Sequence, residues 1–298
     1  MSRENELYNN FWRLSRKGML RWMPDKIHIR IGYFLAFGRR LDLANPVSFS
    51  EKLQWLKLYN RKSEYVAMVD KFLVKEIVAK KIGMKHIIPT LGVWSKFDDI
   101  DFEQLPEQFV IKCTHDSGGV IIVKDKNSMN YESTKSIIEQ SLKLNYYDIG
   151  REWPYKNVIP KIIIEPYLLD EKSGELPDYK FMCFNGKVEC IFVCTERGSE
   201  DGVRITIFDR SWNKLSYERF GHPSSDNQIE KPNNWDEMIG MAETLSKELP
   251  FVRVDLYEVN GEVYFGEYTF FPAGGLERFQ PESADYELGK KLNLTRII

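Results

Sequence analysis

The chain has 298 residues, of which 43% are apolar and 13% aromatic. This length and composition predict a folded protein with a sizeable core and room for two closely packed subdomains, and they exclude a disordered or fibrous chain. The 42 basic and 44 acidic side chains leave a formal net charge of -2. The chain as a whole therefore lacks the basic excess of a general nucleic-acid binder.

No apolar run reaches the roughly 18–20 residues that span a bilayer, and the first residues lack the pattern of a secretory signal. We therefore expect no transmembrane segment and a cytoplasmic location. Four cysteines lie within or beside apolar runs, but no C-x-x-C pair occurs, so we interpret them as small buried thiols rather than a metal or redox site. They are Cys113, Cys183, Cys190 and Cys194.

The first 60 or so residues are predicted to be mainly helical. Within them, Ser48 and Glu51 have the spacing of a capping box. A second helix is expected over Tyr65–Ile82, with Phe72 and Leu73 among its inward residues and Gly83 ending it.

The remaining elements are mostly strands, so the fold class is α+β with mainly antiparallel strands. Asn-Gly pairs at 185–186 and 260–261 are strong signals for hairpins. The expected strands are Phe109–Cys113, Val120–Lys124, Ile162–Leu168, Tyr179–Phe184, Val188–Cys194, Val203–Phe208, Phe251–Val259 and Glu262–Tyr268, and the expected helices are Tyr131–Leu144 and Trp235–Leu249.

The last hairpin carries paired polar residues on both strands. Side chains alternate along a strand, so Arg253 and Asp255 share one face, as do Glu267 and Thr269. A two-residue Asn-Gly loop would put Asp255 and Glu267 on opposite faces. We therefore predict a three-residue loop, Val259–Gly261, with Gly261 in the left-handed conformation.

Two carboxylates on one face repel unless a cation lies between them. Oxygen ligands of this kind suit Mg²⁺ that carries phosphate oxygens as its other ligands. The alternative from this segment alone is a solvated hairpin face with an ordinary salt bridge between Arg253 and an acid.

A glycine-containing loop, Ser117-Gly118-Gly119, separates two predicted strands. Glycines let backbone N–H groups approach phosphate oxygens, and Lys112 just upstream adds positive charge. Glycine pairs are also common in plain hairpins. The sequence has neither G-x-x-x-x-G-K-[ST] nor G-x-G-x-x-G, which argues against a Walker-type or Rossmann nucleotide site.

A third candidate follows the strand at 162–164. Its residues Glu165-Pro166-Tyr167-Leu168 could present backbone groups to an adenine edge, or could simply end an edge strand. Asp178 and Lys180, two residues apart on the next strand, point the same way and are either a nucleotide contact or an exposed pair.

Together and in this order, these pieces resemble the ATP-grasp superfamily over roughly residues 65–278, and most closely its TupA-like branch. The hairpin residues Arg253, Asp255 and Glu267 with the following proline and glycines are similar to the D-alanine–D-alanine ligase pattern. Further segments similar to the branch are Pro46–Leu56, Asp70-Lys71, Ile88-Pro89 and Pro177–Phe181.

The resemblance implies roles for the nucleotide-binding residues. Lys71 and Lys112 match the two lysines that precede the glycine-rich loop, and Ser117, Gly118 and Gly119 would cover the β- and γ-phosphates. The segment from Glu165 through Tyr167 to Leu168 matches the hinge that holds adenine. Asp178 takes the place of an acidic ribose contact, with Lys180 beside it.

It also implies a metal and catalytic set. Asp255 and Glu267 match the Mg²⁺ ligands, and Thr269 stands where the family has an asparagine. Arg253 and Lys112 would stabilise the transferring phosphoryl group. His115 is expected to make a structural hydrogen bond rather than to contact phosphate, whereas Arg197 and Arg204 are candidates for binding an anionic substrate.

The implied architecture is an ATP-grasp fold with a helical N-terminal region at 1–90, a lid subdomain at 91–165 and a metal-binding subdomain at 166–298. The implied reaction uses ATP and Mg²⁺ to join a carboxylate to an amine, through an acyl phosphate. The branch points to a uronic-acid carboxylate of a surface polysaccharide and an amino acid. The alternatives are a kinase on the same fold, a glycosyltransferase of the same pathway, and an inactive binding module.

Overall fold

The chain folds into two compact units in the computed structural model, which describes residues 3–171, 176, 178–196 and 202–296. Unit 1 consists of Met1–Arg40, Arg61–Ile77 and Ile88–Leu168. Unit 2 consists of Leu41–Asn60, Val78–Ile87 and Leu169–Ile298. The helical region expected over residues 1–90 therefore contributes to both units.

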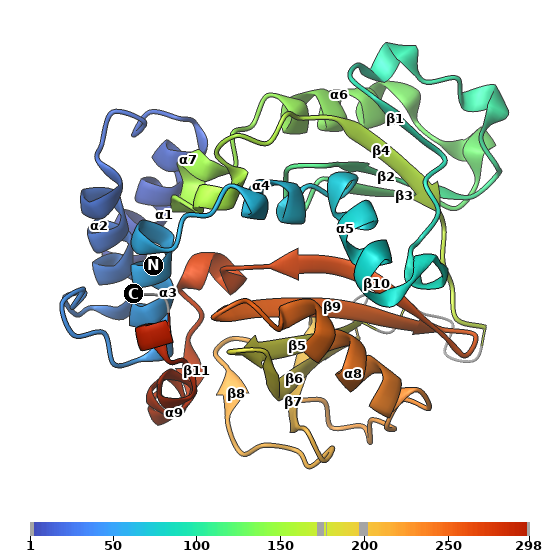
Figure 1. Cartoon of the computed structure of the whole chain (residues 1–298). Helices are drawn as coiled ribbons and strands as arrows, with labels where there is room; N and C mark the ends of the chain where they lie inside the picture. The colour runs from blue at the N-terminus through green and yellow to red at the C-terminus, as the bar shows by residue number, and fades with distance from the viewer. Residues whose placement is uncertain (1–2, 172–175, 177, 197–201, 297–298) are drawn as a thin grey trace. The chain divides into compact units, whose positions relative to one another are not determined.

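Unit 1 begins with two helices, α1 (Arg3–Arg16) and α2 (Asp25–Phe37), which pack on each other (Figure 1). Their contact buries Phe11 and Tyr33 and includes a hydrogen bond of 2.9 Å between Ser15 Oγ and His28 Nε2. Helix α2 ends at Gly38, whose φ of 68° is the left-handed conformation of a glycine C-cap. The short helix α7 (Tyr147–Gly150) contacts α1.

The rest of unit 1 is a four-stranded antiparallel sheet with one covering helix. Helix α6 (Tyr131–Leu142) lies along the sheet and places Ile138 in a core with Phe109 and Ile111 (Figure 1). In spatial order the strands are β1 (Gly92–Trp94), β4 (Ile162–Pro166), β2 (Phe109–Cys113) and β3 (Val120–Val123). The unit thus has an apolar centre built from β-type runs, as predicted.

The single helix expected over 65–82 was wrong: it is two helices, α4 (Glu64–Val69) and α5 (Leu73–Ile82). Asp70 Oδ1 accepts hydrogen bonds from the backbone N–H groups of Phe72 (2.8 Å) and Leu73 (3.0 Å), and so begins a new helix. Phe72 and Leu73 are exposed rather than inward. Lys71 consequently lies in the break between the helices.

Unit 2 is built on a five-stranded antiparallel sheet. One face is covered by α8 (Trp235–Ser246), since the Phe181 and Trp235 rings lie 5.7 Å apart and Tyr268 donates to the Leu245 carbonyl at 3.1 Å (Figure 1). The strand order is β10 (Glu262–Thr269), β9 (Phe251–Val259), β5 (Asp178–Phe184), β6 (Lys187–Thr195) and β7 (Arg204–Asp209). Side-chain alternation therefore puts Lys180 and Asp255 on the face away from α8.

The remaining elements of unit 2 are two helices and a small sheet. Helix α3 (Phe49–Tyr59) starts with the predicted capping box of Ser48 and Glu51 and packs on α9 (Ser283–Lys291). Strands β8 (Glu218–Arg219) and β11 (Phe279–Gln280) pair with each other.

The helices and the cysteines agree with the sequence analysis. Among the described residues, no helix is long and apolar enough to cross a membrane. The cysteines are free thiols, and Cys113, Cys183 and Cys190 are buried, as predicted.

Candidate functional site

The last hairpin of unit 2 brings Asp255 and Glu267 opposite each other, but not through the predicted loop. The three-residue loop was wrong: Val259 pairs directly with Glu262 across Asn260-Gly261, whose φ angles of 51° and 82° are those of a two-residue type I′ turn. The register is corrected later, by a β-bulge at Gly266.

Gly266 is required at this bulge because two neighbours lie very close. A Cβ added there would be 2.9 Å from the Tyr257 ring and 3.1 Å from the Asp255 carbonyl oxygen. With one unpaired residue in β10, the alternation shifts by one position, and Glu267 faces the same side as Asp255. The prediction that Asp255 and Glu267 share one face of the sheet is correct. The cause is a bulge, which the alternation pattern did not reveal.

Asp255 is buried and held by two cationic side chains. Arg253 donates to both of its oxygens, from Nε at 2.6 Å and from Nη2 at 2.7 Å, and Lys180 Nζ donates to Oδ2 at 2.6 Å. Burial alone would favour the neutral acid, but Arg253 and Lys180 outweigh it and hold the pKa of Asp255 below its usual value. Asp255 is therefore a fixed carboxylate at neutral pH.

Lys180 links Asp255 to Asp178, which accepts from the same ammonium group at 2.7 Å. Burial acts to lower the pKa of Lys180, but the two carboxylates raise it above the ordinary value. Asp178 and Lys180 thus share a face, as predicted. Of the two alternatives for these residues, the exposed pair is wrong, since Asp178 is buried.

Glu267 is the accessible carboxylate of the cluster, with a side chain that is 39% exposed. Its Oε1 accepts from Arg253 Nη2 and from the Thr269 hydroxyl, each at 3.2 Å. Two facing carboxylates and a hydroxyl are oxygen donors of the kind that Mg²⁺ accepts when phosphate supplies the other oxygens. Among the described residues, no group of three or more acid, histidine or cysteine side chains is arranged to hold a metal by itself. The residues present fit Mg²⁺ only together with phosphate.

Glu277 is a buried carboxylate on the same side of the sheet that the sequence analysis missed. Its Oε1 accepts from Arg219 Nε at 2.8 Å, while its Oε2 has no hydrogen-bond partner among the residues that the structure describes. Burial raises the pKa of Glu277 above its usual value. Nearby, the ring of Phe279 lies 6.3 Å from that of Phe192, which pairs with Lys180 on the polar face.

Unit 1 brings Lys71 to the glycine-containing loop. The Lys71 backbone N–H donates to the Thr114 carbonyl at 3.0 Å, and its ammonium group donates to the Asp116 carbonyl. Position 71 can make these contacts because it lies in the turn between α4 and α5, outside both helices. The sequence analysis identified Lys71 and the loop as separate candidates, and the structure shows that Lys71 contacts the residues that lead into the loop.

Glu165 is buried at the end of β4 and bound by two lysines. Lys112 Nζ lies 2.6 Å from Oε2, and Lys75 Nζ lies 2.5 Å from Oε1. Burial favours the neutral acid, yet the charges of Lys112 and Lys75 hold the pKa of Glu165 below its usual value. Lys75 was missed in the sequence, although its position four residues after Lys71 was a weak signal.

The loop itself has an exposed tip and a fixed base. Ser117 and Gly118 are exposed, and Gly118 has a φ of 101° that disfavours other residues. At the base, the Asp116 carboxylate accepts a hydrogen bond from the Ser141 hydroxyl, and a Cβ on Gly119 would overlap this pair. Tyr167 and Leu168, the residues expected to form the adenine hinge, are half-buried beyond β4.

His115 makes the structural hydrogen bonds that were expected of it. Its Nε2 donates to the carbonyls of Ser141 (3.1 Å) and Leu144 (3.0 Å) at the end of α6. Burial lowers the pKa of His115, so the ring is neutral at physiological pH.

Of the two arginines proposed for an anionic substrate, Arg197 lies outside the described residues, as does Pro177 of the family-like segment. Arg204 is paired with acids, at 3.4 Å from Glu196 and 3.2 Å from Asp226.

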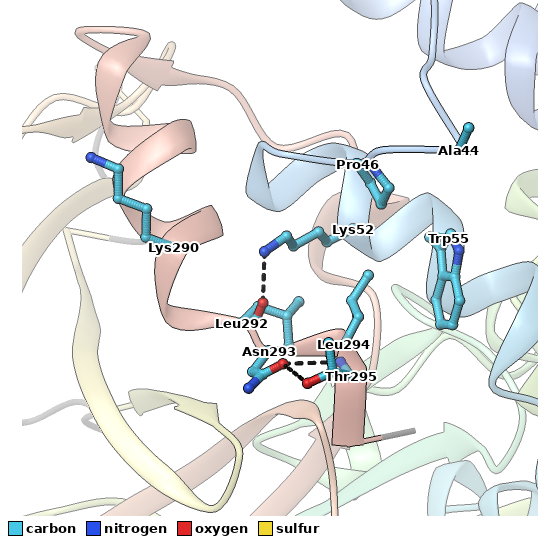
Figure 2. Close-up of a pocket in the computed structure, with 9 residues that line it drawn as sticks. All are labelled: Ala44, Pro46, Lys52, Trp55, Lys290, Leu292, Asn293, Leu294 and Thr295. Atoms are coloured by element: carbon cyan, nitrogen blue, oxygen red, sulfur yellow. Dashed lines mark hydrogen bonds between the residues drawn. The ribbon is translucent and has the colours of Figure 1, made fainter. Parts of the chain in front are cut away.

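A cavity of about 430 Å³ in unit 2 lies apart from these clusters. None of the predicted site residues lines it, and Figure 2 shows Lys52 pointing toward Leu292 while Lys290 points away. Lys52 Nζ donates to the carbonyls of Gly289 and Leu292, each at 2.7 Å, so it satisfies the end of α9. The cavity is not the candidate site.

Comparison with known families now gives these clusters a context. The family model of the TupA-like ATP-grasp proteins matches residues 51–293, and the chain belongs to this family. It therefore has the ATP-grasp fold, with the helical N-terminal segment that the sequence predicted. A search of curated proteins found no match.

The solved structures that the chain resembles share little of its sequence. A D-alanine–D-alanine ligase from Bacillus anthracis complexed with ATP is 18% identical with a TM-score of 0.41, and the match covers 68% of this chain and 55% of that one. An L-amino acid ligase from Bacillus licheniformis is 13% identical with a TM-score of 0.44, covering 86% and 57%. The chain thus spans little more than half the length of these proteins.

Proposed function

We propose that the protein is a Mg²⁺- and ATP-dependent carboxylate–amine ligase. A carboxylate oxygen of the substrate attacks the γ-phosphorus of ATP, and the bond to ADP breaks, which gives an acyl phosphate. The amine nitrogen then attacks the acyl carbon, phosphate leaves with its electron pair, and the nitrogen loses a proton. Family membership and the charge of the two clusters support this assignment.

The cationic residues of unit 1 are assigned to the nucleotide. Lys71 and Lys112 would bind phosphate oxygens, and the backbone N–H groups of Ser117, Gly118 and Gly119 would add neutral donors. Glu165 holds Lys112 in place through their 2.6 Å ion pair. The backbone from Glu165 to Leu168 is assigned to adenine.

The residues of unit 2 are assigned to the metal and the transferring group. Glu267 and Asp255 would hold Mg²⁺, which supplies positive charge to the phosphate oxygens when bound. Asp255 fixes Arg253 through two parallel hydrogen bonds, so the guanidinium is pre-oriented to stabilise charge on the phosphoryl group. Asp178 and Lys180 are assigned to the ribose end, and Thr269 positions Glu267.

The observation that carries the proposal is the pairing of Glu267 with Asp255 beside Arg253. Without the bulge at Gly266, Glu267 would face α8, and the chain would have a single acid next to its arginine. Paired acids with an adjacent arginine are the arrangement expected of a metal-phosphate site.

Glu277 is the residue we assign to the amine. A primary amine reaches an enzyme mainly as an ammonium ion, and it must lose a proton before it can attack. A buried carboxylate with one unpartnered oxygen and a raised pKa suits this task, because its proton affinity lies closer to neutral pH than that of an ordinary glutamate.

For the substrates, we propose a uronic-acid carboxylate of a surface polysaccharide or its precursor, joined to an amino acid in the cytoplasm. This finer assignment rests on the resemblance to the TupA-like branch. The test is incubation with uronate-containing glycan, amino acids, ATP and Mg²⁺. ADP release that requires both the glycan and the amino acid is expected, whereas a stable phosphoester formed without an amine would assign a kinase instead.

The metal assignment is tested by Glu267→Gln, with Glu262→Gln on the same strand as its matched control. Glu262 is exposed and lies at the far end of β10. ADP release is measured while Mg²⁺ is titrated. We expect Glu267→Gln to raise the Mg²⁺ concentration needed for half-maximal release by about 10- to 100-fold, and Glu262→Gln to leave it unchanged. Equal behaviour of the two variants would refute the assignment.

A further inference from the structure

The N-terminal helical pair of unit 1 carries an exposed apolar surface. Three residues of α2, Ile27, Ile31 and Phe34, are spaced i, i+4 and i+7 and therefore form one stripe. They are exposed, Ile27 by 50% and Phe34 by 52%. The turn before α2 adds Trp22, which is 76% exposed, and Met19. We name these five residues the α2 face.

The α2 face is not the inward side of the helix. The residues of α2 that pack inward are His28, Ile29, Gly32 and Tyr33, which are all buried. The inward residues therefore already form the packed core of the helical pair, and the residues of the outer stripe are not part of that core. Exposed aromatic and aliphatic side chains gathered on such an outer stripe mark an interaction surface.

Basic side chains are concentrated in the same part of the chain. Residues 1–40 contain nine Lys and Arg against three Asp and Glu, whereas the other 258 residues contain 33 against 41. Lys26 and Arg30 on α2 are exposed, as are Arg16, Lys17 and Arg40. The acid of this helix, Asp25, is engaged by Arg61 at 2.7 Å and by the Tyr147 hydroxyl at 2.6 Å.

We propose that the α2 face binds the surface of an anionic lipid bilayer. Tryptophan favours the boundary between head groups and acyl chains, and aliphatic residues on a helix can enter that boundary to a shallow depth. The exposed lysine and arginine of α2 would contact lipid phosphates. The excess of basic over acidic residues in this segment matches the negative charge of such a bilayer.

This inference does not rest on the proposed ligase reaction. The α2 face contains none of the residues assigned to nucleotide, metal or amine. A protein with no activity on any glycan would still be expected to bind vesicles through these residues.

The test is cosedimentation of the full chain with vesicles of equimolar phosphatidylglycerol and phosphatidylcholine. We expect binding to these vesicles, weak or absent binding to phosphatidylcholine alone, and loss of binding as salt approaches about 1 M, where the Debye length is about 3 Å. No binding to the anionic vesicles at low salt would overturn the proposal.

Variants locate the contact. The double variant Ile27→Ser with Phe34→Ser is expected to lower the partition coefficient more than tenfold, and Arg30→Gln about fivefold. The matched controls are Ile159→Ser, at a residue 73% exposed outside the α2 face, and Lys124→Gln, exposed at the end of β3. Both controls should bind as the parent does. Thermal unfolding of every variant checks that the fold is retained.

Two outcomes would refute the lipid assignment. One is equal loss of binding in the controls, which would indicate nonspecific adsorption. The other is concentration-dependent self-association, measured by light scattering without vesicles, that the double variant abolishes while vesicle binding is absent. That result would assign the α2 face to a second copy of the chain.

Discussion

Each unit buries one carboxylate between two cationic side chains, yet the two clusters differ in net charge. In unit 1, Glu165 is shared by Lys75 and Lys112, so the cluster has one positive charge to spare. In unit 2, the cations Lys180 and Arg253 meet three acids, which leaves one negative charge to spare. The first cluster therefore favours an anion such as phosphate, and the second favours a cation such as Mg²⁺.

The cations also differ in chemistry. Lysine can lose its proton when its partner is removed, and burial already lowers the pKa of Lys75. Arginine remains charged at every pH at which proteins are stable. Removing the charge of the central acid should therefore cost less in unit 1 than in unit 2, and this difference can be measured.

The largest effect is expected from Asp255→Asn. The amide keeps the shape of the acid but leaves Arg253 without its main counter-charge in a poorly solvated position. We expect the free energy of unfolding to fall by about 3–5 kcal/mol in a urea titration. Glu287→Gln, at an exposed site on α9, is the control and should change it by less than about 0.5 kcal/mol.

Glu165→Gln is expected to cost less, about 1–3 kcal/mol at neutral pH. Without Glu165, the pKa of Lys75 falls further in the folded state. As pH rises, this lysine therefore loses its proton in the folded state before it does so in the unfolded state. The folded state then binds fewer protons than the unfolded state, so the stability of the variant should rise with pH up to the ordinary lysine pKa. If the variant shows the same pH dependence as Asp255→Asn, the distinction between lysine and arginine is wrong.

Gly266→Ala tests the bulge. The added Cβ would press on the Tyr257 ring and the Asp255 carbonyl, so we expect a loss of about 1–3 kcal/mol in unfolding free energy, together with weaker Mg²⁺ dependence. Gly240→Ala is the matched control, because nothing lies within 4 Å of a Cβ at that exposed helical position. The control should be neutral or stabilising by up to about 1 kcal/mol.

The smallest effect is expected from Glu277→Gln. Burial raises the pKa of Glu277, so ionising it disfavours the folded state as pH rises above the unfolded pKa. The neutral amide avoids this cost, and we expect it to be more stable at pH 7 by less than about 1 kcal/mol. Urea titrations should show the gain vanish below pH 4, where the acid is protonated in both states. A loss of stability at pH 7 would show that the ion pair with Arg219 outweighs burial.

Local patterns gave most of the fold correctly. The two Asn-Gly hairpins, the capping box at Ser48 and the apolar strands all depend on residues close in sequence, and the structure has them where they were predicted, although the second hairpin has a shorter loop. The break at Asp70 was also local, but an aspartate within an apolar periodicity is compatible with a continuous helix. Here the alternative cap was stronger.

The site was predicted less completely, because its contacts join distant residues. Lys75 reaches Glu165 across 90 positions, and Glu277 is buried by β8 and β11, which sequence patterns did not reveal. Family resemblance supplied Lys112 and Asp255, while the partners that set their charge states came from the packing of the sheets.

The bulge at Gly266 makes the number of residues in β10 as important as their identity. Deleting this one glycine would let β10 pair with β9 without interruption and would leave Glu267 opposite Asp255, because Phe265 already pairs with the neighbouring Leu256. One additional paired residue before Glu267 would instead turn over every side chain beyond it. Glu267 would then point toward the apolar side under α8, and Asp255 would lose its partner acid. Spacing in this strand, counted in single residues, is therefore as much a part of the site as its acids.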